Sequence, residues 1–382
     1  MTPVQSHFDW LHSSALLSGT SPGTPSAPTT LHGGESLESL WTMDTLMTQL
    51  NDSAAGCFDE IVPVDEFFLG EDGETLYIDS LGAFRLNPIA KASLAARFEL
   101  PAKKLWQDWA TNDARLLEQR CNTVNTEIYR IRKERTDAAW FCRLRETDST
   151  IYLRVVLSSA YTPADNLPVL STVLDAMEAA GFGGASLSDA LLTDSVFWAR
   201  FSLPGVTREL RPGEVWTGAI RISNSEVGTK AAAVYAHLCR TNDVGHALPG
   251  LSFSGTLARA GWERHAGTTT ERILQRLEHN VPTILDQLDG YFAKLSEFRD
   301  LIIHDPHKAV TTIAREHRVP ERLAQLAQAA LMTAGYPPES TATGLDVILA
   351  FLSAAEQAKD FEEQFYIEAL LGYLVKTAKM PR

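Results

Sequence analysis

The sequence contains little cysteine and no long apolar segment, and these two shortages exclude several classes of protein. Four cysteines occur among 382 residues, and no two of them have the Cys-x-x-Cys spacing of a zinc or redox site. We therefore expect a reduced, cytoplasmic protein rather than a disulfide scaffold. No apolar run is long enough to span a membrane, and the N-terminus lacks the basic start and apolar block of a signal peptide, so we expect no membrane partner.

Positive charge is missing from the first part of the chain. Residues 1–80 contain no lysine or arginine and carry a net charge of -13, whereas residues 81–280 carry +3 and residues 281–382 carry -4. An acidic segment of this kind could fold over a basic groove of the same chain or recruit a protein partner. It could also do no more than keep the protein soluble.

The motifs of several common enzyme classes are absent as well. The sequence has no P-loop, no Gly-x-Ser-x-Gly nucleophile motif and no paired-histidine metal motif. The stretch from Gly181 to Ser186 fails the dinucleotide-binding pattern because its last position is serine. The sequence therefore indicates no cofactor, no metal and no catalytic residue. An enzyme stays open as a minor alternative, built around Glu226 and a divalent cation.

The chain divides into four parts, and their patterns predict an α+β fold. Residues 1–34 are rich in Ser, Thr, Pro and Gly, which predicts a flexible arm, and residues 35–80 form an acidic N-terminal segment. Residues 81–266 show runs of period two with helical insertions, which predicts a mixed, strand-rich central domain. Residues 267–382 follow helical spacing and predict an α-helical C-terminal region.

A few local patterns predict where elements begin and end. Glu71–Gly73 is typical of a hairpin turn. Residues 230–241 fit a strand or a helix equally well. Thr268 and Glu271 have the spacing of a capping box, and Asp305 before a proline predicts the start of a further helix, with two more to follow.

One stretch interleaves cationic and aromatic side chains. Its candidate nucleic-acid-binding residues are Arg130, Arg132, Lys133, Arg135, Trp140, Phe141, Arg143 and Arg145. If Trp140 faces the core of a strand, Phe141 and Arg143 share the opposite face with Arg145. Cations neutralise phosphates and aromatic rings stack on unpaired bases, so this face predicts a platform for single-stranded DNA. The alternative is a solvated helix end that leads into a strand, with the arginines paired to nearby glutamates.

Two further stretches carry ordered polar motifs. Arg154, Tyr161, Asp165 and Asn166 match an Arg-Ala-x-Leu-Ser-Asp-Arg-Tyr-x-x-x-Asp-Asn pattern. Asn224, Ser225, Glu226, Gly228 and Asn242 match an Asn-Ser-Glu-x-Gly turn followed by Cys-x-Asn-Gly. In this order, and with the helical stretch before them, they resemble the phage/plasmid-like protein family that carries a domain of unknown function. Ser159 and Ala160 stand where the pattern has Asp-Arg, and Asp243 stands where it has Gly.

The resemblance implies a role on mobile genetic elements and brings no established reaction. Members occur on phages and conjugative plasmids, beside genes for single-strand binding and recombination. We therefore expect a DNA-metabolism protein that binds single-stranded DNA and could promote strand annealing or recombination, with a helical tail that supports a homo-oligomer. The alternative is a counter-defence interaction protein, whose acidic N-terminal segment mimics DNA and binds a protein partner.

The Asn-Ser-Glu-x-Gly turn allows a structural and a functional interpretation. In the structural one, Asn224 and Ser225 close the turn with their own side chains and Gly228 supplies a positive φ. In the functional one, Glu226 binds a divalent cation or orients Arg240, and Asn242 contacts a base or a phosphate. Cys239, which follows the turn, is expected in the core.

Overall fold

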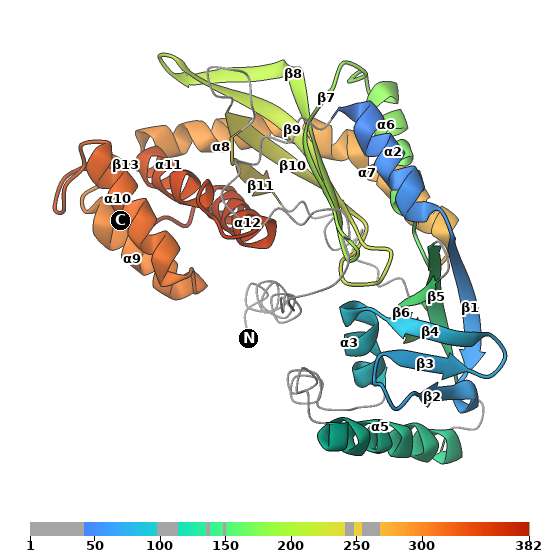
Figure 1. The fold of residues 1–382 in the computed structure, drawn as a ribbon. Coiled ribbons are helices and arrows are strands. Elements are labelled where there is room, and N and C mark those ends of the chain that lie inside the picture. Colours follow the sequence, from blue (N-terminus) through green and yellow to red (C-terminus); the bar gives the residue numbers. More distant parts are fainter. Residues whose placement is uncertain are drawn as a thin grey trace.

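The structure is a computed structural model that describes residues 42–97, 114–134, 138–147, 150–240, 248–253 and 268–381. This part contains two large β-sheets, helices packed against them and a C-terminal group of helices, so the predicted α+β fold is confirmed. In Figure 1 the sheet of β1 to β6 lies at the lower right, the sheet of β7 to β11 lies above it, and the C-terminal helices lie at the left. The predicted arm, residues 1–34, lies outside the described residues.

The first sheet, called here the N-terminal sheet, has six strands in the order β1-β5-β6-β4-β3-β2. The strands are β1 (Cys57–Pro63), β2 (Phe67–Leu69), β3 (Thr75–Ile78), β4 (Gly82–Leu86), β5 (Ala139–Thr147) and β6 (Thr150–Ser158). Strands β4 and β6 pair in parallel and the other neighbours are antiparallel. The predicted hairpin turn is confirmed, because Glu71–Gly73 joins β2 to β3 with Gly73 at a φ of 65°.

Strand pairing crosses the predicted boundary between residues 35–80 and 81–266. Strand β1 belongs to the acidic segment, yet it pairs along its length with β5 of the central domain, and β3 pairs with β4 in the same way. A strand needs its neighbours to satisfy its backbone and to bury its inner side chains. The part of the acidic segment from Cys57 to Ile78 therefore belongs to this sheet.

Helices cover one face of the N-terminal sheet. They are α3 (Pro88–Arg97) and α5 (Ala114–Glu134), and a short 3-10 helix, η2 (Val64–Glu66), lies beside α5. Helix α5 buries Cys121, Val124, Ile128 and Ile131, which recur every three or four residues. Trp140, Cys142 and Leu144 of β5 point into the same core, as the alternation of this strand predicts.

The second sheet, called here the central sheet, has five antiparallel strands in the order β11-β10-β9-β8-β7. They are β7 (Ser186–Leu192), β8 (Phe197–Arg211), β9 (Glu214–Asn224), β10 (Ala233–Arg240) and β11 (Leu251–Phe253). The ambiguous segment 230–241 is thus a strand from Ala233 to Arg240. It sits inside a sheet that is covered on both faces, so both sets of alternating side chains are mostly buried and its period-two signal is weak.

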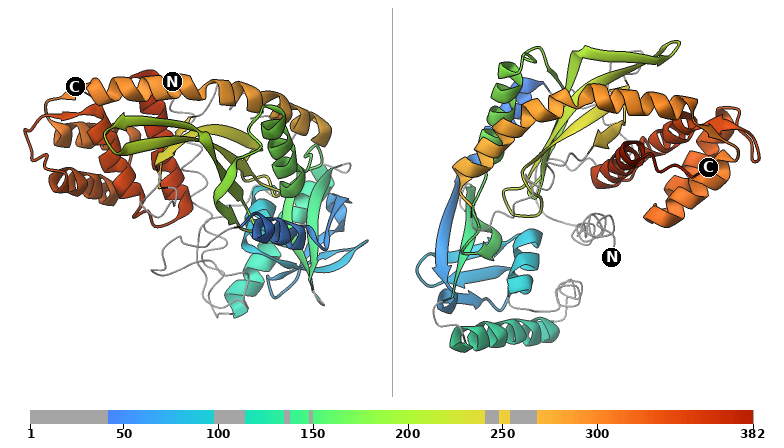
Figure 2. Two further views of the ribbon diagram at one scale, coloured as in Figure 1. Left: turned by 90° about the horizontal axis from the view of Figure 1, so that it is seen from above. Right: turned by 180° about the vertical axis from the view of Figure 1, so that it is seen from behind.

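Helices pack against both faces of the central sheet (Figure 2). One face is covered by α6 (Asn166–Ala179), α7 (Thr270–Asp286) and α8 (Leu288–Asp300), with α2 (Met43–Ala54) beside α6 at the β7 edge. The other face is covered by α12 (Phe361–Thr377), whose Phe365 packs against Trp198 of β8 at 4.4 Å between ring centroids. The main hydrophobic core lies between this sheet and the helices.

The C-terminal region is helical, as predicted, although two details differ. Besides α12 it contains α9 (Pro306–His317), α10 (Glu321–Thr333) and α11 (Gly344–Ala355), and a two-residue pairing of β12 (Ile302–Ile303) with β13 (Ala342–Thr343). Asp305 caps α9 as expected, accepting the Lys308 N–H at 2.9 Å. Three helices follow α9 instead of two. The cap of α7 is Thr269 and not Thr268, because the Thr269 hydroxyl accepts the Arg272 N–H.

Candidate functional site

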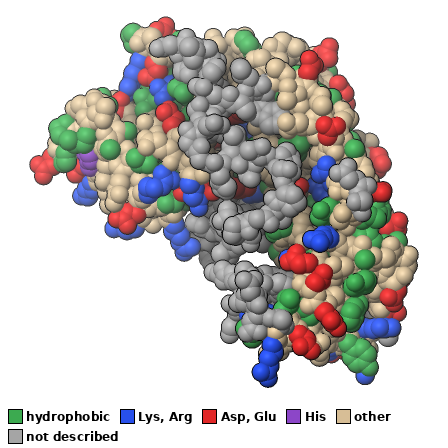
Figure 3. Space-filling view, in the orientation of Figure 1, with side chains coloured by type: hydrophobic (Ala, Val, Ile, Leu, Met, Phe, Trp, Pro, Cys, Tyr) green, Lys and Arg blue, Asp and Glu red, His purple; other side chains and the backbone are tan. Residues whose placement is uncertain are grey.

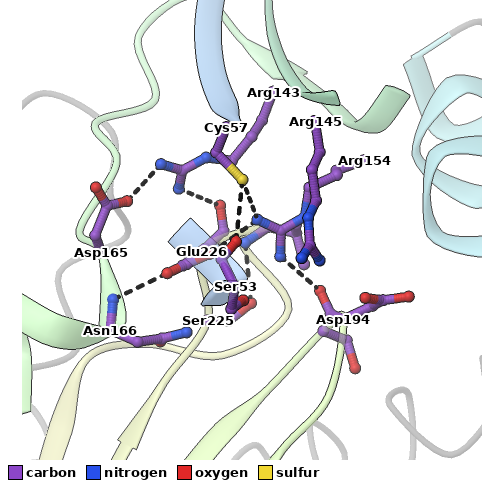
Figure 4. Close-up of polar contacts among 12 residues, drawn as sticks. Ser53, Cys57, Arg143, Arg145, Arg154, Asp165, Asn166, Asp194, Ser225 and Glu226 are labelled. Carbon is purple, nitrogen blue, oxygen red and sulfur yellow. Dashed lines mark hydrogen bonds and ion pairs between the residues drawn. The ribbon is translucent and has the colours of Figure 1, made fainter. Parts of the chain in front are cut away.

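Residues of both polar motifs meet at the joint between the two sheets (Figure 4). Strand β9 ends at Asn224, and the turn that follows, Ser225–Gly228, lies against the face of the N-terminal sheet that α3 and α5 leave open. The start of α6 reaches the same place from the central sheet. The structure therefore brings together these motif residues: Arg154, Tyr161, Asp165, Asn166, Asn224, Ser225, Glu226 and Gly228.

Glu226 lies at the centre of the joint. Its Oε2 accepts from Arg154 Nη1 at 2.9 Å, and its Oε1 accepts from the backbone N–H of Asn166 at 3.0 Å. Asn166 is the first residue of α6, so the carboxylate also faces the positive end of a helix. Glu226 and Arg154 are each 4 % exposed. Both carboxylate oxygens are thus held by the protein itself.

A bulge in β6 aims Arg154 at Glu226. Arg143 pairs with Val155 and Leu144 with Leu153, so Arg154 has no residue opposite it on β5. An extra residue of this kind bends the strand and redirects its side chain. Arg154 Nη2 also donates to the Asp194 carbonyl at 3.2 Å. Burial, the largest single influence, would lower the pKa of Arg154, but Glu226 and Cys57 together outweigh it and hold the pKa above its ordinary value.

Arg143 joins four elements at the same place. Its Nη2 pairs with Asp165, its Nε lies 3.1 Å from Asp59 Oδ1 on β1, and its Nη1 donates to the Glu226 carbonyl at 3.2 Å. Burial raises the pKa of Asp59, and the nearby Arg143 only partly offsets that effect. Arg143 therefore connects β1, β5, the turn and the start of α6.

The remaining motif residues shape the turn. The Ser225 hydroxyl accepts from the N–H groups of Val227 and Thr229, and Gly228 adopts a φ of 73°. A Cβ at Gly228 would lie 3.1 Å from Leu157 Cδ1. Both the positive φ and this close approach therefore favour glycine. Asn224 reaches across the joint instead of closing the turn, because its Nδ2 donates to the Ala164 carbonyl at 2.7 Å.

The functional interpretation of the turn is not supported by this geometry. Within the described ranges, no group of three or more His, Cys, Asp or Glu side chains could hold a metal ion. The expected pairing of Glu226 with Arg240 is wrong, since Arg240 lies at the far end of β10, over the ring of Trp216. Asn242 lies outside the described residues. Cys239 is buried, as expected.

The predicted single-strand platform on β5 is wrong as an exposed surface. Phe141 and Arg143 do share a face, but each is only 4 % exposed, and Trp140 is buried on the other side. The Ser225–Gly228 turn covers this part of the strand, and the ring of Tyr161 packs on Phe141 at 5.1 Å. A base cannot stack on a ring that is already covered. Arg145 is half-buried and donates to the Asp52 carbonyl at 3.0 Å.

The basic end of α5 matches the alternative interpretation. Arg130 pairs with Glu127 and Glu134, both at 2.7 Å. Lys133 lies over the ring of the exposed Tyr129 at 4.6 Å, and Arg132 is exposed. Arg135 lies outside the described residues. Exposed pairs of this kind are those of an ordinary solvated helix end.

The uncovered half of the same face carries a row that the sequence patterns did not single out. Arg145 pairs with Tyr152 and Tyr152 with Arg85, so these side chains follow one another across β5, β6 and β4. Next to them, Phe68 and Tyr77 face each other across β2 and β3 with ring centroids 6.4 Å apart. Phe68 is 52 % exposed and Tyr77 45 %. Phe68 and Tyr77 each stand between two buried apolar residues of a short strand, and this alternation was the available signal.

A second buried charged cluster lies between the central sheet and α12, and the sequence patterns missed it too. Arg200 and Arg221 stand opposite each other on β8 and β9, and both approach Glu368 of α12, which also accepts the Gly250 N–H at 3.0 Å. His237 Nε2 lies 3.1 Å from Arg200 Nη1. Arginine can only donate, so this nitrogen accepts and Nδ1 carries the proton toward the Ser252 hydroxyl, 2.9 Å away.

Comparison with known proteins gives no relative from which a role could be carried over. No family model, no curated protein and no solved structure matches this chain. Among the described residues, no helix has both the length and the apolar character needed to cross a membrane.

Proposed function

We propose that this chain is a non-enzymatic binding protein of phage or plasmid type, whose N-terminal sheet recruits a positively charged protein partner. The observation that carries the proposal is the charge of the folded N-terminal sheet and of α2 before it. No lysine or arginine precedes Arg85 in the sequence. The acidic residues exposed in this part are Asp44, Asp52, Asp59, Glu60, Asp65, Glu71, Asp72 and Asp79.

These carboxylates are held in place by the fold. Asp59 and Glu60 lie on β1, which is paired on the sheet, and the turn around Asp72 is fixed by hydrogen bonds from the N–H groups of Glu74 and Thr75. Burial opposes ionisation of Asp72, but these hydrogen bonds, with Arg85 nearby, lower its pKa below the ordinary value. A rigid array of carboxylates attracts the same basic surfaces that DNA attracts, so a DNA-binding protein is a fitting partner class for a counter-defence role.

Exposed apolar side chains accompany the acids. They are Phe58, Ile61, Phe68 and Tyr77. On the face shown in Figure 3, acidic and hydrophobic side chains lie side by side over the strands at the lower right. Protein interfaces combine aromatic anchors with a charged rim, and charge steers the approach of the partner.

Fluorescence anisotropy of a labelled oligolysine peptide with the full chain tests this proposal. We expect binding that weakens as salt rises, and a loss of about tenfold for the variant Glu71→Lys with Asp79→Lys, since two exposed charges change sign. The matched control reverses Glu316 and Glu321, which are exposed on α9 and α10. Equal losses in both variants would show that only net charge matters and would remove the proposed surface.

Single-stranded DNA binding, with strand annealing or recombination as its use, is the second candidate. It is favoured by one observation, the row of Arg145, Tyr152 and Arg85 beside the exposed rings of Phe68 and Tyr77. Aromatic rings on an open sheet stack on bases, and arginines beside them contact phosphates. The acidic surroundings oppose this function, which is why it ranks second.

The same instrument decides between the two candidates with a labelled single-stranded oligonucleotide. If DNA is the ligand, affinity should fall steeply with salt, and Tyr77→Ala with Arg85→Ala should weaken binding about tenfold or more. Arg130→Ala is the control, because that arginine is paired on α5. An oligonucleotide that does not bind the full chain at low salt would rule this candidate out.

A further inference from the structure

Strand β1 is a free edge of the N-terminal sheet. It pairs with β5 along one side, from Cys57 to Pro63, and in the described part of the chain no strand pairs with its other side. Figures 1 and 2 both show β1 at the outer margin of the molecule, with no element beyond it. An edge strand presents a row of backbone donors and acceptors that an added strand can use.

The side chains of β1 repeat one pattern on both faces. Phe58 and Glu60 lie opposite Leu144 and Cys142, on one face of the sheet, whereas Asp59 and Ile61 lie on the other. Phe58 is 37 % exposed and Ile61 53 %. Each face of the edge therefore carries one apolar and one acidic side chain, and of the two acids Asp59 also lies 3.1 Å from Arg143 Nε.

We propose that an extended basic segment of a partner protein adds to β1 as a seventh strand of the N-terminal sheet. This rests on the proposed function, since it names how the basic partner is recognised. Backbone pairing supplies affinity, and alternating side chains supply specificity. Opposite charges directly across a strand pair stabilise it. The segment that fits has a lysine or arginine beside an apolar residue on each face.

A second copy of this chain does not fit the edge. Two β1 strands paired in antiparallel would bring Asp59 and Glu60 of one copy close to the same carboxylates of the other, and like charges across a pair destabilise it. The exposed Asp52 and Asp65, which flank β1 in the sequence, extend the acidic character beyond both of its ends. Charge complementarity thus selects a basic strand.

Protection against aggregation is another use of charges on an edge, and Pro63 would serve it as well. That use does not account for Phe58 and Ile61. Both are large, apolar and exposed on the very strand that has to be protected. Hydrophobic side chains on a free edge are what an arriving strand packs against.

The test uses the full chain and an acetylated, fluorescent peptide of about ten residues, a usual strand length, in which pairs of lysines alternate with pairs of valines so that each face carries both. A control peptide has the same sequence with alternate backbone nitrogens methylated, which removes donors on one edge and keeps the charge. We expect the methylated peptide to bind at least about tenfold more weakly, the loss of roughly one or two hydrogen bonds. Hydrogen exchange should slow at residues 57–63 when the first peptide binds.

A variant pair locates the site. Glu60→Lys should weaken binding of the unmethylated peptide about tenfold, and Glu321→Lys, an exposed acid of α10, should leave it unchanged. Equal affinity of the two peptides, with exchange unchanged at β1, overturns strand addition while the acidic surface as a docking site survives. Failure of both peptides to bind, with binding of the oligonucleotide, removes the proposed function and this inference together.

Discussion

The molecule buries charge in two places, and the two differ in how dry they are. At the joint, Arg143 is buried but its partners Asp59 and Asp165 have side chains 28 % and 44 % exposed. Beneath α12, Arg221 and Glu368 are 1 % and 0 % exposed. Water can relax around a broken Arg143 contact at the joint, whereas it cannot reach the cluster beneath α12. The Arg154–Glu226 pair of the joint, with both side chains 4 % exposed, lies between these two cases. The two clusters therefore stabilise the fold to different degrees, although both rest on arginine and glutamate.

The largest expected effect comes from removing Glu368, the acid of the cluster beneath α12. Glu368→Ala leaves two buried arginines with one acid fewer and the Gly250 N–H without its acceptor. We expect the free energy of unfolding to fall by about 3–5 kcal/mol, the usual result of breaking a buried pair from one side. Urea denaturation followed by circular dichroism measures it. Glu321→Ala, on the exposed face of α10, should stay within about 0.5 kcal/mol of the parent.

A smaller loss is expected at the joint. Glu226→Gln keeps the shape and one oxygen, which can accept from Arg154, but then the amide NH2 faces the backbone N–H of Asn166, a donor against a donor. We expect a loss of about 2–3 kcal/mol, the consequence of a buried donor left unsatisfied beside a buried charge. Glu368→Gln, the same change in the dry cluster, sharpens the comparison. If Glu368→Gln lowers the free energy of unfolding by less than Glu226→Gln does, exposure to water does not explain the difference between the two clusters.

The smallest expected effect is a pH dependence of stability that comes from His237, in the cluster beneath α12. Burial, with Arg221 and Arg200 nearby, lowers the pKa of His237 well below its ordinary value of 6.5. The unfolded chain then binds a proton that the native protein does not, so stability is lost as pH falls below about 6.5, with a slope of up to 1.4 kcal/mol per pH unit, roughly. In His237→Gln this slope should be shallower. Parallel curves for the two proteins, measured by urea denaturation across pH, would contradict the assignment.

Local patterns foretold most elements, because hairpin turns and helix caps depend on neighbouring residues. The Asp305 cap and the turn at Gly73 are of this kind. Coverage of a strand is not local. Phe141 and Phe68 both lie on the face of the sheet opposite α3 and α5. The turn after Asn224 covers Phe141 and leaves Phe68 exposed. No spacing rule along β5 contains that information. The pattern therefore predicts a platform at Phe141, where the ring is covered.

The clusters show the same limit. The motif residues were singled out as a set, but the bulge that aims Arg154 at Glu226 depends on how β5 and β6 align. Glu368 gave a weaker signal, a charged residue between the buried Ile367 and Leu370 on a helix that is apolar on most of its surface. Its two arginine partners lie on β8 and β9, more than a hundred residues earlier in the chain.

The order of synthesis gives the joint a further consequence. Arg143 and Arg154 leave the ribosome before Glu226, since they precede it by 83 and 72 residues. Until β9 and its turn emerge, Arg143 and Arg154 lack the contacts with Glu226 that they make in the folded protein. A nascent chain that stops short of Glu226 therefore has all six strands of this sheet but lacks the turn that covers one face, and that face is open to chaperones and proteases.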